Sequence, residues 1–190
     1  MRIIGGSAGG RRLSVPPRGT RPTSDRVRES LFSSLDALLG GWSGVRVLDL
    51  YAGSGALGLE ALSRGATEAV LVERDRGSAR IIEANATSVA VPGARVVCAD
   101  VDAWSAREAD AAYDVVFCDP PYAVPTEAIR SLLRGLGQRG WLAPDAVAVV
   151  ERDARDADEP WPEGEWEPLR RRDFGDTALW YGRHLGSEPL

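Results

Sequence analysis

The sequence contains no lysine, a single histidine and two cysteines among its 190 residues. Because His184 is the sole imidazole, few side chains can build a metal site, and we expect no metal. Cys98 and Cys118 both lie in apolar, strand-like runs, so we expect buried, reduced thiols rather than a disulfide or a metal pair. No apolar run approaches the roughly 18 residues that cross a bilayer, and the first residues lack the apolar stretch of a signal peptide. These absences predict a cytoplasmic protein without a membrane partner.

The absence of lysine makes all 23 basic residues arginine. Genomic codon bias explains this more simply than phosphate recognition, so the position of the arginines carries more information than their identity. The net charge of −5 argues against a protein that binds nucleic acid through its overall charge. However, residues 1–30 contain seven arginines and two acids, whereas the remaining chain contains 16 arginines and 26 acids. The basic N-terminal end is therefore a candidate phosphate-binding surface.

A chain of this length, with 44% hydrophobic residues, is expected to bury one substantial core. We predict a basic N-terminal arm or hairpin (1–24), one main domain (25–185) and a short tail (186–190). We expect a monomer.

From residue 45 onward, apolar strands alternate with amphipathic helices, which predicts an α/β fold with a parallel sheet covered on both faces. The acidic, proline-rich stretch 151–168 breaks this pattern and is predicted to be a solvated loop. Two further strands, flanking a turn, predict a terminal antiparallel hairpin. The expected strands are 45–51, 69–73, 95–99, 113–118, 146–150, 169–172 and 177–181. Five helices are expected. The first has Thr23 or Ser24 as its N-cap, the second follows the turn 53–58 and ends by Gly65, and the third runs from about Arg76 to Val89. A short helix follows Asp102, and the last has Pro125 at its first helical position.

The turn after the first strand contains Gly53-x-Gly55-x-x-Gly58, which matches the dinucleotide-binding fingerprint. Alone, this pattern leaves a nicotinamide cofactor open. Acidic residues also follow or end four successive strands, at Asp49, Glu73, Asp100 and Asp119. Strand ends at the carboxyl edge of an open α/β sheet form one crevice, so we expect these acids to converge on one ligand.

The stretch Asp119-Pro120-Pro121-Tyr122 places a carboxylate and an aromatic ring on a stiff turn, because proline fixes φ and offers no N–H. Such an arrangement suits a flat heterocycle with an exocyclic amine: the Asp119 carboxylate and the Pro120 carbonyl accept its two N–H bonds, and Tyr122 stacks on the ring. A base bound in this way must first flip out of the stack of neighbouring bases in its nucleic acid. The alternative is that Pro-Pro-Tyr only ends a strand and binds no ligand.

Together, the glycine-rich loop and the Asp-Pro-Pro-Tyr turn resemble those of class I S-adenosylmethionine (SAM) methyltransferases. This resemblance implies a Rossmann-like seven-stranded sheet, mostly parallel with a C-terminal antiparallel hairpin. It implies that the loop takes the methionine end of SAM, that Glu73 takes the ribose hydroxyls, and that Asp100 and Val101 flank the adenine. The implied catalytic residues are Asp119, Pro120 and Tyr122. The implied cofactor-binding residues are Asp49, Tyr51, Gly53, Ser54, Gly55, Glu73, Arg74, Asp100, Val101 and Asp119.

Motifs along nearly the whole chain are similar to the bacterial RsmD-type 16S rRNA guanine-N2 methyltransferases. These motifs are Met1-Arg-Ile-Ile-Gly-Gly, Gly10-Arg-Arg-Leu, the stretch 21–32, the two site motifs and Phe174-Gly-Asp-Thr-Ala-Leu-Trp-Tyr181. The resemblance implies methylation of one guanine, number 966 in the family's target, on the small ribosomal subunit. The residues expected to contact RNA are Arg11, Arg12, Arg18, Arg21 and Thr23.

Three other functions stay open at this point. The protein could methylate an amine of adenine or cytosine in DNA or another RNA, because the four-residue motif does not select the base. It could be a ribosome-assembly factor without catalysis, or, more distantly, an NAD-dependent dehydrogenase.

Overall fold

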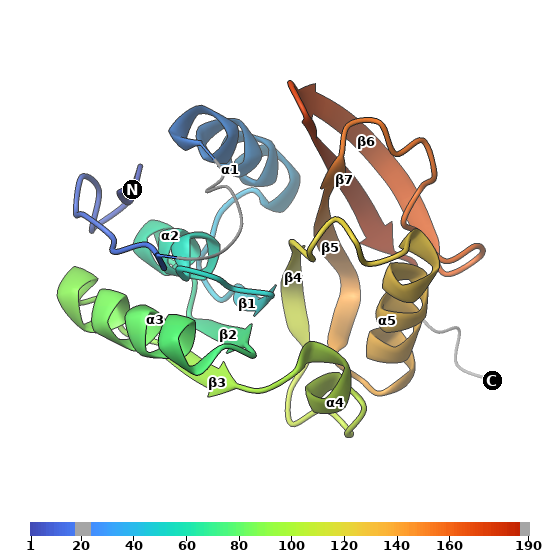
Figure 1. Cartoon of the computed structure of the whole chain (residues 1–190). Coiled ribbons are helices and arrows are strands. Elements are labelled where there is room, and N and C mark those ends of the chain that lie inside the picture. Colours follow the sequence, from blue (N-terminus) through green and yellow to red (C-terminus); the bar gives the residue numbers. More distant parts are fainter. Residues whose placement is uncertain (18–23, 187–190) are drawn as a thin grey trace. The chain divides into compact units, whose positions relative to one another are not determined.

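A computed structural model describes residues 1–17 and 24–186 (Figure 1). The chain divides into two compact units, Met1–Asp100 (unit 1) and Val101–Leu190 (unit 2), and each is described by itself. The predicted division into arm, main domain and tail stays a prediction.

Unit 1 is built around three parallel strands in the order β3-β2-β1. Ala69, Val70, Leu71 and Val72 of the central strand are completely buried, as expected for a strand covered on both faces. The strands are β1 (Arg46–Leu50), β2 (Glu68–Glu73) and β3 (Ala94–Cys98), and the helices are α1 (Asp25–Leu39), α2 (Ala56–Arg64) and α3 (Arg76–Val89).

The helix ends of unit 1 follow the capping residues in the sequence. The Ser24 side chain accepts a hydrogen bond from the Val27 N–H, so α1 begins where its N-cap predicts, and it ends at Gly40 with φ of 70°. Asp75 caps α3 in the same way through the Ser78 N–H. The predicted bounds of α3, 76–89, are confirmed. In contrast, β1 ends at Leu50, because Tyr51 has already left the strand conformation, with φ of 61°.

The N-terminal residues form the predicted hairpin-like arm, which has one antiparallel bridge, between Arg2 and Arg12. Three of its apolar side chains, Ile3, Ala8 and Leu13, are at most 5% exposed. A hairpin with a single bridge has little stability of its own. Contacts with the rest of unit 1 must therefore hold it in place.

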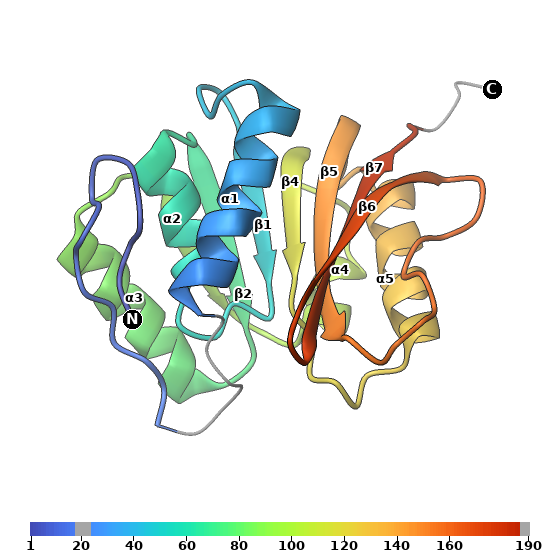
Figure 2. The ribbon, with the colours of Figure 1, turned by 90° about the horizontal axis from the view of Figure 1, so that it is seen from above.

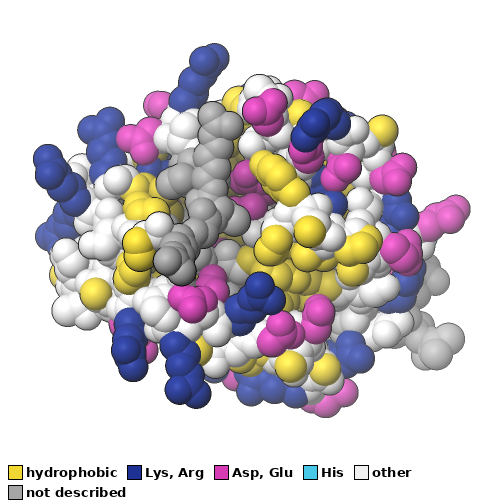
Figure 3. Space-filling view, in the orientation of Figure 1, with side chains coloured by type: hydrophobic (Ala, Val, Ile, Leu, Met, Phe, Trp, Pro, Cys, Tyr) yellow, Lys and Arg dark blue, Asp and Glu magenta, His cyan; other side chains and the backbone are white. Residues whose placement is uncertain are grey.

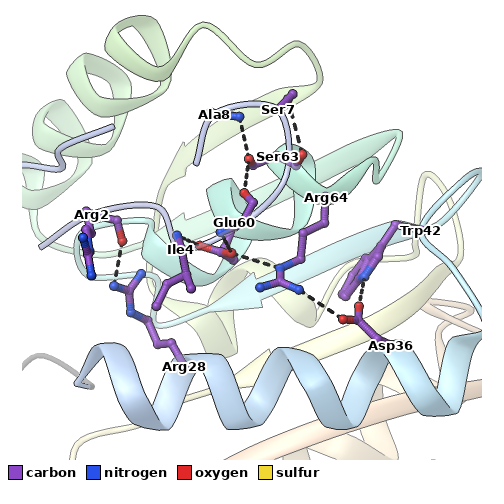
Figure 4. Close-up of polar contacts among 11 residues, drawn as sticks. Arg2, Ile4, Ser7, Ala8, Arg28, Asp36, Trp42, Glu60, Ser63 and Arg64 are labelled. Atoms are coloured by element: carbon purple, nitrogen blue, oxygen red, sulfur yellow. Dashed lines mark hydrogen bonds and ion pairs between the residues drawn. The ribbon is translucent and has the colours of Figure 1, made fainter. Parts of the chain in front are cut away.

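Figure 4 shows how α2 receives this hairpin. The buried Glu60 carboxylate accepts hydrogen bonds from the backbone N–H groups of Ile4, at 2.7 Å, and Gly5, at 2.8 Å. The Ser63 hydroxyl donates to the Gly5 carbonyl and accepts from the Ala8 N–H. Two side chains of α2 thus satisfy backbone groups that the hairpin cannot pair internally.

Unit 2 contains four strands in the order β4-β5-β7-β6 (Figure 2). Strands β4 and β5 pair in parallel, whereas β7 is antiparallel to both β5 and β6, so the predicted C-terminal antiparallel hairpin is confirmed. The strands are β4 (Tyr113–Cys118), β5 (Leu142–Asp153), β6 (Trp166–Phe174) and β7 (Thr177–His184), and the helices are α4 (Val101–Ser105) and α5 (Thr126–Gln138).

The prediction of a solvated loop at 151–168 is wrong in part. Its ends extend β5 and begin β6, and Pro160, Trp161 and Pro162 are buried. The indole rings of Trp161 and Trp166 stack with centroids 5.3 Å apart, and Trp166 also lies 5.4 Å from the His184 ring. Burial of these large rings outweighs the acidic composition of the surrounding chain.

Two smaller expectations also need correction. Cys118 is buried as predicted, but Cys98 is exposed, because it ends the edge strand β3. Pro125 is the N-cap of α5 rather than its first helical residue, with φ of −63° and ψ of 147°. No helix among residues 1–17 and 24–186 is both long and apolar enough to cross a membrane.

Candidate active site

One candidate site, in unit 1, is formed by the turn between β1 and α2 and by the first residues of α2. Residues 51–58 are called the glycine loop below. Tyr51, Gly53 and Gly55 have φ of 61°, 58° and 78°, so three of five successive residues adopt the left-handed conformation. Such a conformation costs little for glycine and more for tyrosine. The backbone therefore turns sharply here and leads into the N-terminus of α2, which has no side-chain cap.

The three glycines of the fingerprint have different tasks. A Cβ on Gly55 would lie 2.8 Å from Ile82 Cγ2, and a Cβ on Gly58 would lie 2.8 Å from Leu71 Cδ2, so both glycines allow α2 to pack closely. A Cβ on Gly53 would have only the Tyr51 carbonyl, at 4.0 Å, as a neighbour. Gly53 thus marks the place where the backbone is open to a ligand.

Asp49 lies beneath the glycine loop and is 2% exposed. Its Oδ2 accepts a hydrogen bond from the Gly58 N–H at 2.9 Å, which fixes the first turn of α2. Burial raises the pKa of Asp49 to about 7, and the nearby negative charge of Glu73 adds to the increase, while the Gly58 hydrogen bond opposes it. Asp49 is therefore an acid that changes its charge near neutral pH and that a neighbouring cation would keep ionised.

Glu73, at the end of β2, is held by the backbone on both carboxylate oxygens. Oε2 accepts from the Gly53 N–H at 2.9 Å, and Oε1 accepts from the Asp75 N–H at 2.8 Å. Each carboxylate oxygen has a second lone pair, so the group can still accept two O–H donors from a ligand. This is the arrangement that a pair of neighbouring sugar hydroxyls requires.

The other predicted residues of unit 1 vary in position. Tyr51 and Ser54 are half-buried, whereas Arg74 and Asp100 are exposed at the ends of β2 and β3. Val101, which begins unit 2, is 3% exposed. The structure brings Asp49, Glu73 and the glycine loop together; a role for Arg74, Asp100 and Val101 stays a prediction.

A second candidate site, in unit 2, is the Asp119–Tyr122 turn. Asp119 is half-buried directly after β4, Pro120 is buried, and Tyr122 is 49% exposed. The Val124 N–H donates to the Pro121 carbonyl at 2.9 Å and closes the turn. The exposed tyrosine ring is available for stacking.

Two residues that sequence reasoning missed support this turn. The buried Arg152 of β5 donates from Nη2 to the Val124 carbonyl at 2.8 Å. The hydroxyl of Thr177, the first residue of β7, lies 3.3 Å from the Tyr122 hydroxyl. Thr177 belongs to the terminal motif of the chain, which was a usable signal, whereas nothing in the sequence around Arg152 indicates its contact.

Two of the arginines predicted to bind RNA, Arg11 and Arg12, are exposed. Arg11 also donates from Nη1 to the carbonyls of Ser88 and Val89 at the end of α3, so it has a structural task. Arginine side chains project over the area of the hairpin and α3 in Figure 3. The predicted contacts of Arg18, Arg21 and Thr23 lie outside the described residues.

No group of three or more histidine, cysteine, aspartate or glutamate side chains that could hold a metal ion occurs in the part of the chain that the structure describes.

Known proteins are similar to this chain along almost its full length. The family model described as "conserved hypothetical protein 95" matches residues 1–183. Ribosomal RNA small subunit methyltransferase D of Escherichia coli K12 is 37% identical over 179 residues, which cover 94% of this chain and 87% of the relative.

Solved structures confirm the predicted methyltransferase fold. The Escherichia coli protein yhhF, assigned to the methyltransferases, has a TM-score of 0.84 and 36% identity, and the match covers 98% of this chain and 99% of that one. An RNA methyltransferase from Salinibacter ruber, solved with S-adenosyl-L-homocysteine, has a TM-score of 0.64 at 20% identity, covering 89% and 97% of the two chains. This chain therefore belongs to the conserved hypothetical protein 95 family, the RsmD-like family that its motifs resemble.

Proposed function

We propose that this protein transfers the methyl group of SAM to the exocyclic N2 amine of a guanine in 16S rRNA. The observation that carries the proposal is the Asp119–Tyr122 turn, in a chain that matches an rRNA small subunit methyltransferase over 94% of its length. The choice of guanine rests on the flanking motifs of the RsmD type, since the turn itself suits any base amine.

In this proposal the glycine loop holds the methyl donor. The Asp49 carboxylate pairs with the ammonium group of the donor, and Glu73 accepts the two ribose hydroxyls with its remaining lone pairs. The uncapped N-terminus of α2 favours the donor's carboxylate, because its first N–H groups carry partial positive charge. Gly53 allows the donor to lie close to the loop backbone, because it has no side chain that would occupy this space.

Asp119, Pro120 and Tyr122 then prepare the base. An exocyclic amine is a poor nucleophile because its lone pair is delocalised into the ring. If Asp119 and the Pro120 carbonyl accept its two N–H bonds, the nitrogen can pyramidalise and direct its lone pair outward. SAM supplies a methyl group that its sulfonium activates. The amine nitrogen attacks this methyl carbon in line, and S-adenosyl-L-homocysteine leaves as the neutral thioether. The N–C bond forms, the C–S bond breaks, and Asp119 accepts the proton that the amine loses.

The substrate assignment is tested with labelled SAM supplied to small ribosomal subunits, naked 16S rRNA, tRNA and DNA. We expect label only in 16S rRNA, and digestion followed by mass spectrometry should yield N2-methylguanosine. Label confined to DNA or tRNA would overturn the assignment and favour another amino-methyltransferase. Stabilisation of the protein by NAD rather than SAM would favour a dehydrogenase.

The buried acid under the glycine loop predicts a pH dependence of donor binding. Because the pKa of Asp49 is about 7 and the donor's ammonium requires the ionised form, affinity should increase as pH rises through that value. We expect S-adenosyl-L-homocysteine to bind about tenfold more weakly at pH 6 than at pH 8. Calorimetric titration at several pH values measures this. The Asp49→Asn variant should bind more weakly and lose most of the pH dependence; an equally steep dependence in that variant would rule out Asp49 as its source.

The arginines of the arm predict a salt-dependent contribution to RNA binding. Replacing Arg12 and Arg18 by glutamine should weaken RNA binding. The slope of log affinity against log salt concentration should become less steep by about one to two, because each lost phosphate contact reduces the number of counterions released on binding. Arg11 is left intact because it holds the end of α3. The matched control is the Arg155→Gln, Arg170→Gln pair in unit 2. Filter binding at several salt concentrations measures the slopes, and equal slopes for both pairs would argue against the arm.

A further inference from the structure

Asn85 on α3 is a buried amide in contact with two separate parts of unit 1. Its side chain is on the apolar inner face of the helix, between Ile82 and Val89, and the residue is 3% exposed. A polar side chain in such a position is costly unless its hydrogen bonds are satisfied. The amide therefore has a specific task, and its partners show which.

Three hydrogen bonds use the oxygen and both N–H groups of the amide. Oδ1 accepts from the Ser14 N–H at 2.8 Å, and Nδ2 donates to the Ser14 carbonyl at 2.9 Å. The second N–H of Nδ2 donates to the Ser54 carbonyl, also at 2.9 Å. Ser14 is in the arm, and Ser54 lies between the two left-handed glycines of the glycine loop. One side chain thus joins the arm to the loop through backbone atoms of both.

The arm is the element that this link can influence. It has one internal bridge, and its second half, residues 11–14, is held to α3 by the Arg11 contacts and by Asn85. Arg12 lies in this half of the arm and is exposed. The docked position of residues 11–14 therefore sets where this predicted RNA contact lies, and an undocked arm would present it differently.

We propose that Asn85 couples the glycine loop to the arm, so that binding of the methyl donor and binding of RNA strengthen each other. This inference rests on the proposed function. A donor bound to the glycine loop fixes the position of the Ser54 carbonyl, and this carbonyl fixes the Asn85 amide. The two hydrogen bonds between Asn85 and Ser14 then favour the docked arm, with residues 11–14 held against α3. By linkage, RNA that holds the arm docked must increase donor affinity by the same factor.

The test measures a ratio of affinities rather than activity. The dissociation constant of small subunits that lack the methyl group is measured with and without saturating S-adenosyl-L-homocysteine. We expect the wild-type protein to bind the subunit about fivefold more tightly in the presence of the nucleoside, at the lower end of typical coupling. In the Asn85→Asp variant the ratio should fall to about one, because a carboxylate keeps the Ser14 N–H bond but cannot donate to the Ser54 carbonyl.

A second variant and a control complete the experiment. Asn85→Ala removes all three hydrogen bonds and should also give a ratio near one, whereas Thr87→Ala, an exposed position on the same helix, should keep the wild-type ratio. If the Asn85 variants lower both affinities but keep a fivefold ratio, Asn85 has only a structural role and the inference is wrong. Independent binding of both ligands to the wild-type protein also overturns it while leaving the proposed function intact. A wild-type protein that binds neither ligand refutes both.

Discussion

Replacing Asp119 by alanine should lower the rate constant of methyl transfer by about 1000-fold or more. The variant loses the acceptor that holds the base amine and the group that takes its proton, and each of these effects is typically worth about 100-fold or more. Asp119→Asn retains one acceptor oxygen, so we expect it to keep more activity than the alanine variant. Single-turnover transfer from labelled SAM to small subunits measures both.

The control for this experiment is Asp158→Ala, an exposed aspartate of the same unit, which should behave like the wild-type protein. An alanine variant at Asp119 that keeps more than about a tenth of the wild-type rate would exclude a catalytic role for this carboxylate. A strain in which Asp119→Ala restores ribosome assembly fully, without methylation, would instead favour a non-catalytic assembly factor.

The largest effect on stability is expected at Glu60. Its Oε1 and Oε2 accept the two hairpin N–H groups, and Oε1 also pairs with Arg64 Nε at 2.9 Å (Figure 4). Glu60→Ala leaves these partly buried N–H donors without a partner, and breaking a buried charge pair typically costs about 3–5 kcal/mol. Arg64 keeps its ion pair with Asp36, at 3.1 Å, which places the expected loss nearer the lower value.

Urea unfolding of the full chain measures this loss. The matched control is Glu83→Ala, an exposed glutamate on α3, which should change the free energy of unfolding by less than about 0.5 kcal/mol. Glu60→Gln preserves the volume and one acceptor and should be intermediate. A loss below about 1 kcal/mol in Glu60→Ala would mean that the hairpin is held mainly by its apolar side chains.

Much of the fold was predictable because local signals and burial agreed. Apolar runs between helices with clear caps located the strands, and Asp75 and Ser24 begin their helices where the sequence predicts. Strand ends were less certain: β1 ends one residue early because the glycine loop begins at Tyr51. Periodicity detects which face is buried, but it does not detect where a strand gives way to a strained turn.

The candidate site was predictable in its chemistry and less so in its supports. Asp49 and Glu73 lie at the glycine loop, as their positions at the ends of parallel strands indicate. Arg152 and Asn85 act through contacts with residues far away in the chain, and such contacts leave no local pattern. The same limit applies to Trp161, which packs in a stretch whose composition is typical of solvated loops.

The exposed end of β3 offers a practical consequence. Cys98 is paired in register with Glu73, and the second thiol, Cys118, is buried. A maleimide fluorophore should therefore attach selectively at Cys98, beside the strand end that carries the ribose-binding carboxylate of the proposed function. The native chain thus supplies its own attachment point for an optical reporter of nucleoside binding, without engineering of a new cysteine.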